Sequence, residues 1–553
     1  MTASRGATPS RLSSRARDAA LVSVLIALAA ALYRPWHATP FELYDFSEFL
    51  GYLLDNDTVG ARMRAVLHYY AQQGRIPVLQ YIQLVLTWEL FGAQPLGWKV
   101  VKFVTLAVVV AVTYALMRRL GASRAGATAG AALLVCAPVD VANWLRVHIT
   151  EPSGFLLILA ATWVATSYQT AARWRERAVA IAALITLAMW FKETFVAFVP
   201  FIVLVGCCWQ RGGQLLPLRL DRRAWFLVLA IAAPVALSLS AFLYASSHGS
   251  PEAYAANYAA GGRSAEGWTR EVFDRLRALT LPVRGSWLLT DNADRWRSEA
   301  RALLVPANVI FLLLVAAGVT VAWKRGDGRA TAARAGIALS IPIAGLVVYL
   351  PWPWFHSTYA LVFLLGSAIL LAFSLTWLES VGKRGVGLAA YALAALTVAH
   401  ASIVTQKDAT RFMVLSVVEA DAAIAMRAYA GSDSILVAAW PEEARVWWGL
   451  PARLGRYAVA GQPLSLRVVG VTCDRIGTAA RRAPAAPIVL YVDRCAHVMK
   501  DLPPPTRWLR SPFAYLHWRL LRPMTDSVRI NLWDPRTGEH AAAQAEAPAV
   551  LAR

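Results

Sequence analysis

Long apolar runs alternate with short polar segments through the first 404 residues of the chain. Runs such as AWFLVLAIAAPVALSLSAFLY and LLVPANVIFLLLVAAGVTVAW can cross a bilayer core of about 30 Å, which takes roughly 20 apolar residues. The pattern predicts about eleven membrane-spanning helices, at residues 19–36, 99–117, 125–142, 153–170, 178–191, 194–209, 224–244, 303–323, 335–350, 357–378 and 385–404. The fifth and sixth are short and nearly adjacent, so we expect them to form a tight hairpin.

Basic residues occur in the short segments on alternate sides of successive crossings. These segments are the N-terminal arm, the stretch with Arg118, Arg119 and Arg124, and the motifs RWRER, RLDRR, KRGDGRATAAR and GKRG. Short cytoplasmic loops retain Lys and Arg, so the pattern predicts an inside N-terminus and, after an odd number of crossings, an outside C-terminus. The formal net charge of +21 is spread over many loops, which argues against a nucleic-acid partner. We expect a multi-pass protein of the cytoplasmic (inner) membrane, in contact with membrane lipids.

The predicted fold is mainly α: a polytopic membrane helix bundle with a small α/β extracytoplasmic C-terminal domain. We expect a cytoplasmic basic arm at 1–18, a transmembrane domain at 19–404 with outer loops at 37–98 and 245–302, and the outer domain at 405–553. In the outer domain DSILVAAW, APIVLYVD and DSVRINLW predict strands, and PEEARVWWGL predicts a helix. Cys473 and Cys495 both fall there, where an oxidising compartment would allow them to pair.

An acidic stretch opens the first outer loop of this basic chain. The segment PFELYDFSEFL contains Asp45 and Glu48, and no Lys or Arg occurs between Arg34 and Arg62. A carboxylate at the membrane boundary can act as a general base, because partial desolvation raises its pKa. The alternative is a solvated amphipathic helix, since acids and aromatic residues alternate there at helical spacing.

Three other places carry ionisable residues in apolar surroundings, where they are costly and therefore functional candidates. The turn NWLRVHITEPSGF contains Arg146, His148 and Glu151, and the alternative is that Arg146 and Glu151 simply pair with each other. The segment AMWFKETFVAFVP contains Lys192 and Glu193, whose alternative role is to close the hairpin by an ion pair. The turn PWPWFHS contains His356, which could bind a phosphate or belong to an interfacial aromatic belt.

The order of these features resembles the C-type superfamily of integral-membrane glycosyltransferases, which use polyprenyl-phosphate-linked sugars. YDFSEF stands where that group has an acidic motif, and FGAQPLGWKVV is similar to the stretch that follows in its protein-mannosyltransferase-like branches. RVHITEPSGFLL and WFKETFVAFVP occupy the places of a second acidic turn and a Lys-Glu hairpin. The resemblance covers roughly residues 20–210.

The resemblance implies a transferase that acts on the outer face. Asp45, or Glu48 one turn further on, would deprotonate an acceptor hydroxyl on a glycan, lipid or protein, with Glu151 as a second catalytic acid. Cations would stabilise the departing phosphate. The substrate-binding candidates are Arg146, His148, Lys192, Glu193, Arg263 and His356. No cofactor is required, a divalent metal is an open alternative, and no metal ligands are indicated.

Two other classes of function share this topology. A surface-polysaccharide polymerase or ligase would rely on loop arginines such as Arg263, Arg270 and Arg284. A transporter or non-enzymatic assembly protein would show repeated halves with broken helices, or acids deep within several helices. Neither repeats nor such acids are evident beyond the Lys192–Glu193 pair.

Overall fold

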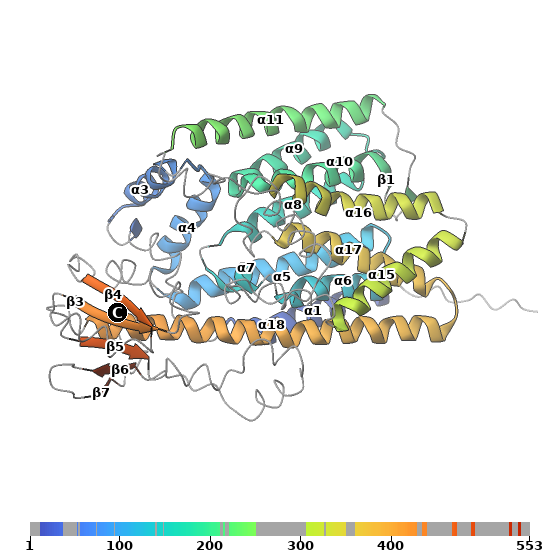
Figure 1. Cartoon of the computed structure of the whole chain (residues 1–553). Helices are drawn as coiled ribbons and strands as arrows, with labels where there is room; N and C mark the ends of the chain where they lie inside the picture. The colour runs from blue at the N-terminus through green and yellow to red at the C-terminus, as the bar shows by residue number, and fades with distance from the viewer. Residues whose placement is uncertain are drawn as a thin grey trace, which may run out of the picture.

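The computed structural model describes most of the helical region and five strands near the C-terminus (Figure 1). The described residues are 11–36, 52–53, 56–72, 74–92, 94–138, 141–147, 149–210, 214–215, 221–249, 306–325, 328–349, 360–427, 434–439, 467–472, 488–492, 530–533 and 540–543. Nine of the residues singled out from the sequence lie outside this part: Asp45, Glu48, His148, Arg263, Arg270, Arg284, His356, Cys473 and Cys495. The helix expected at 441–450 also lies outside it.

Most of the helices overlap the predicted apolar runs, but two lie within residues 37–98, where a loop was expected, and the last one continues beyond residue 404. They are α1 Arg11–Tyr33, α3 Val59–Gln72, α4 Val78–Phe91, α5 Pro95–Arg119, α6 Arg124–Cys136, α7 Val141–Leu145, α8 Glu151–Ala165, α9 Trp174–Phe191, the 3-10 helix η2 Glu193–Phe198, α10 Val199–Cys208, α11 Arg222–Ser247, α15 Pro306–Lys324, α16 Gly328–Tyr349, α17 Ala360–Glu379 and α18 Arg384–Arg427. Within the described ranges, 7 are long and apolar enough to cross a membrane, and α6, α8 and η2–α10 are shorter apolar segments. The chain is a multi-pass, mainly helical membrane bundle; the total of about eleven crossings stays a prediction.

Helix α17 is the centre of the bundle. Its apolar span is almost entirely buried, and α6, α15, α16 and α18 pack around it. Close approach depends on small residues, as is usual between membrane helices. At Gly126 of α6, an added Cβ would lie 2.3 Å from the carbonyl oxygen of Ala372 in α17. Any larger residue would therefore force these two helices apart.

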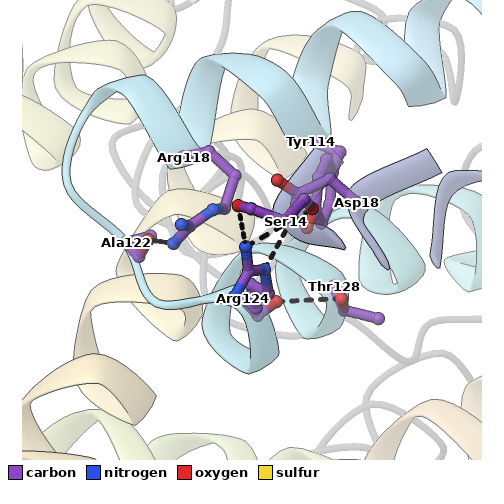
Figure 2. Close-up of polar contacts among 7 residues, drawn as sticks. All are labelled: Ser14, Asp18, Tyr114, Arg118, Ala122, Arg124 and Thr128. Carbon is purple, nitrogen blue, oxygen red and sulfur yellow. Dashed lines mark hydrogen bonds and ion pairs between the residues drawn. The ribbon is translucent and has the colours of Figure 1, made fainter. Parts of the chain in front are cut away.

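One end of the bundle, called the basic end here, carries Arg118 and Arg124, whose contacts Figure 2 shows. Asp18 of α1 accepts hydrogen bonds from the Tyr114 hydroxyl of α5 and from Arg124 Nε of α6, each at 2.8 Å, and Arg124 also donates to Ser14. Arg118 donates to the carbonyl of Ala122, which closes the α5–α6 turn. Asp18 thus ties together the ends of three helices.

Further contacts extend this end across the bundle. The Arg119 guanidinium lies 4.4 Å from the ring centroid of Trp163 in α8, and the Tyr168 hydroxyl donates to the carbonyl of Arg223 at the start of α11, 2.8 Å away. On the other side, Arg325 after α15 donates to Ser380 after α17. The described basic segments therefore share one end of the bundle, as their alternation predicts.

The opposite end carries α3, α4 and a mixed sheet (Figure 1). The strands are β3 Ser434–Ala439, β4 Arg467–Thr472, β5 Ile488–Val492, β6 Ile530–Trp533 and β7 His540–Ala543, in the order β4-β3-β5-β6-β7. β3 is parallel to β4 and β5, with Ile435 opposite Val468 and Ile488, whereas β6 and β7 run antiparallel. A separate two-stranded ribbon joins β1 Trp209–Gln210 to β2 Gln214–Leu215. The three predicted strands are confirmed, β4 and β7 were not predicted, and a separate α/β domain stays a prediction.

The shared basic end leads to a test of orientation. We expect a reporter that is active only outside the cytoplasm to be active when fused after residue 410 in α18 and inactive when fused after residue 120, next to Arg118 and Arg124, because cationic loops are retained inside. Activity with the opposite pattern would reverse the orientation.

Candidate functional site

Charged side chains are buried at the end of the bundle opposite the basic end. Arg146 has no exposed surface, and Glu151, Lys192 and Lys102 are each buried. Arg146 lies in the turn between α7 and α8, and Glu151 is the first residue of α8. A carboxylate in the first turn of a helix is stabilised by the helix dipole, and Pro152 next to it fits because its missing N–H has no partner in the first turn.

Lys192 stands where the chain leaves α9. Helix α9 ends at Phe191, Lys192 is extended with φ −158° and ψ 118°, and η2 begins at Glu193. The break gives the tight hairpin predicted between the fifth and sixth apolar runs. It also places both charged residues at the hairpin tip rather than inside a continuous helix.

A glycine in α8 allows the hairpin to come close. An added Cβ at Gly154 would lie 2.3 Å from Phe195 Cε2 and 2.9 Å from Phe191 Cβ. Glu151 precedes Gly154 by about one helical turn, on the same face of α8. The close contact at Gly154 therefore brings the tip of the hairpin beside Glu151.

Glu151 and Lys192 form a buried ion pair. Lys192 Nζ lies 3.7 Å from Glu151 Oε1, with side-chain exposures of 7% and 10%. Removing two charges from water costs several kcal/mol per ion, so neither would be stable there without the other. Glu151 Oε2 is also buried and has no hydrogen-bond partner among the described residues.

A second ion pair joins the hairpin to the α3–α4 segment. Arg75 Nη2 lies 3.7 Å from Glu193 Oε1, and both side chains are about three-quarters buried, with exposures of 26% and 20%. Near Arg75, the Tyr70 and Tyr81 rings stack with centroids 4.4 Å apart. The α3–α4 segment is thus linked directly to the hairpin tip.

The ion pairs found differ from the two that the sequence suggested as structural alternatives. Among the described residues, Glu151 pairs with Lys192 rather than with Arg146, and Glu193 pairs with Arg75. The hairpin is therefore held by ion pairs to α8 and to the α3–α4 segment. Of the nine predicted site residues, the structure describes Arg146, Glu151, Lys192 and Glu193, and it brings all four to one end of the bundle.

Sequence reasoning missed two residues of this cluster, Arg75 and Lys102. Lys102 stands out in principle, because it is a lysine within the apolar run of α5. The described charges of the cluster are then Arg75, Lys102, Arg146 and Lys192 against Glu151 and Glu193. Four cations and two carboxylates favour an anionic ligand over a cationic one.

Within the residues that the structure describes, no group of His, Cys, Asp and Glu is arranged to hold a metal ion.

Comparison with known proteins gives distant likenesses of fold. No protein-family model and no curated protein matches the sequence. Among solved structures, the chain is similar to the Archaeoglobus fulgidus oligosaccharyltransferase, with 10% identity, 95% of this chain and 73% of that chain covered, and a TM-score of 0.42. It is also similar to ArnT from Cupriavidus metallidurans bound to undecaprenyl phosphate, with 12% identity, coverages of 91% and 95%, and a TM-score of 0.41.

The apo structure of the same ArnT gives 13% identity, coverages of 90% and 94%, and a TM-score of 0.42. All three likenesses are at 10–13% identity and concern the fold over most of the chain. A likeness of this size assigns no activity to the chain, so its function has to be argued from its own residues.

The buried ion pair predicts a specific pattern of stability. Glu151→Gln or Lys192→Met alone should lower the free energy of unfolding by about 3 kcal/mol or more, because each leaves one buried charge uncompensated. The double variant should recover most of that loss. Thermal unfolding of the purified protein in one detergent measures all three.

The matched control is the exposed pair Arg173–Glu176, with side-chain exposures of 82% and 69%. Glu176→Gln should change stability little, because solvent screens exposed pairs. If the double variant at Glu151 and Lys192 were as unstable as the sum of the single ones, the two charges would not be coupled.

Proposed function

We propose that the chain is a membrane glycosyltransferase that moves a sugar from a polyprenyl-phosphate donor to an acceptor at the outer end of its bundle. The observation that carries this proposal is the buried cluster of Arg146, Glu151 and Lys192 in an otherwise apolar helix bundle. Ionisable groups buried in a membrane protein are costly and mark substrate sites by default. A lipid phosphate reaches such a place from the bilayer, with its tail between helices.

The transfer reaction assigns a task to each group. The acceptor hydroxyl attacks the anomeric carbon and loses its proton to the carboxylate of Asp45 or Glu48, while the bond from that carbon to the phosphate oxygen breaks. The phosphate leaves with the bonding electron pair. Fixed cations stabilise the negative charge that develops on it, and in a site that excludes water they do so strongly.

Among the described residues, Arg146 and Lys192 are the cations best placed for the phosphate, with Arg75 at the rim. Arg146 is fully buried, and its guanidinium can donate two parallel hydrogen bonds to a phosphate. Lys192 is paired with Glu151, which holds the lysine in place. A phosphate bound by Lys192 would therefore lie next to this carboxylate. His148, Arg263 and His356 remain predicted additions to this set.

Transfer activity tests the proposal. The protein in lipid nanodiscs is supplied with a panel of undecaprenyl-phosphate sugars and with a membrane extract as the source of acceptor hydroxyls, and the released undecaprenyl phosphate is measured. Asp45→Asn keeps the shape of the side chain and removes the base, so the rate should fall about 100-fold or more while expression stays normal. Asp57→Asn, at an exposed position further along the same loop, is the control and should be nearly silent.

The outcomes separate the possible bases. Full activity of Asp45→Asn together with loss in Glu48→Gln would assign the base to Glu48. Full activity of both variants would end the catalytic interpretation of the acidic stretch. Turnover of none of the lipids by the unmodified protein, together with no binding of undecaprenyl phosphate, would contradict the proposed function itself.

A further inference from the structure

Lys102 joins the two sides of the turn that contains Arg146. Its ammonium group is buried and donates to the carbonyl of Asn143, 2.9 Å away, and to the carbonyl of Ile149. Because both carbonyls bind one nitrogen, the two oxygens lie within about 6 Å of each other. Trp144 follows the first of these carbonyls and Thr150 follows the second, so the backbones of Trp144 and Thr150 lie near each other, with Glu151 next in the chain.

The same turn concentrates buried polar atoms that lack partners. Trp144 Nε1, Thr150 Oγ1 and Glu151 Oε2 have no hydrogen-bond partner among the described residues. Their exposures are 4%, 2% and 7%. An unpaired buried polar group costs about 1–3 kcal/mol. Three such groups between residues 144 and 151 therefore require an explanation.

The chemistry of these three atoms restricts what can satisfy them. An indole N–H only donates a hydrogen bond, an ionised carboxylate only accepts, and a threonine hydroxyl does both. A phosphate oxygen accepts from Trp144 but cannot donate to Glu151. A hydroxyl group both accepts and donates, so a ligand with several hydroxyls satisfies the whole set.

The two oxygens of Glu151 differ in their partners. Oε1 lies on the side of Lys192, where the proposed function places the phosphate, whereas Oε2 is left for a donor. In a sugar phosphate, the hydroxyls of the ring lie within a few ångströms of the phosphate group. The arrangement of charge and of unpaired atoms thus follows the order of groups in such a molecule.

We propose that Trp144, Thr150 and Glu151 form a hydroxyl-binding subsite that holds the sugar of the donor lipid, in a turn that Lys102 preorganises. This inference rests on the proposed function and adds to it the residues that recognise the sugar. It assigns binding of the phosphate and binding of the sugar to different side chains. The two can therefore be separated by experiment.

The test compares two lipids that differ only in the sugar. Binding of undecaprenyl phosphate and of undecaprenyl-phosphate hexoses (glucose and mannose) is measured on the full chain in nanodiscs. Thr150→Val and Trp144→Phe each remove one hydrogen-bonding group with little change of shape. Each should weaken the preferred glycosylated lipid about 5-fold to 10-fold and change binding of undecaprenyl phosphate less than about 2-fold. Thr150→Ser keeps the hydroxyl and should bind like the unmodified protein.

The chain offers matched controls for both substitutions. Thr113 Oγ1 and Trp209 Nε1 are also buried without a partner among the described residues, but they lie in α5 next to Tyr114 and just after α10. Thr113→Val and Trp209→Phe should leave the affinities for both lipids unchanged.

If Thr150→Val and Trp144→Phe weakened the binding of both kinds of lipid equally, the subsite would be overturned, because that result would indicate a general distortion of the turn. Unchanged binding of the glycosylated lipids would overturn it as well, as would a lack of any preference for them in the unmodified protein. If the unmodified protein bound neither kind of lipid, the proposed function would fail and the subsite with it.

Discussion

The ion pair between Glu151 and Lys192 is the constraint on which the end of the bundle opposite the basic end depends. Either charge alone would be unstable in so apolar a place, so α8 and the α9–η2 hairpin must meet at one point. Two local features make that meeting possible: the end of α9 before Lys192, and the missing side chain of Gly154. The positions of Arg75 and Arg146 follow from it, because each belongs to a segment that packs on this hairpin or on α8.

The two ends of the bundle use charge in different ways. At the basic end, Asp18 and Arg124 are about one-third exposed and connect helix termini, which suits a role in anchoring and orientation. At the opposite end, the charges lie within the protein and two carboxylates are distributed among four cations. Of the two arrangements, only the second is buried and has an excess of positive charge, as the proposed phosphate site requires.

Long apolar runs are a strong signal, so the sequence predicted the long helices of the bundle, but α3 and α4 lie in a stretch that it assigned to a loop. It selected Arg146, Glu151, Lys192 and Glu193 from the cost of burying charge, but the partner of each acid depends on tertiary packing. Arg75 gave no such signal, since an arginine in a polar loop is ordinary. Strand β7 was missed because its run of alanines has little strand propensity, and Asp45 and Glu48 stay predictions.

A structure of the full chain with undecaprenyl phosphate bound, determined by cryo-electron microscopy in nanodiscs, would show which end of the bundle holds the phosphate. We expect the phosphate to lie within hydrogen-bond distance, about 3 Å, of Arg146 or Lys192. We also expect Glu151 to remain paired with Lys192 in the complex. A phosphate bound instead at the basic end beside Arg118 and Arg124 would contradict the proposed site, as long as only protein contacts surround Arg146 and Lys192 in the same structure.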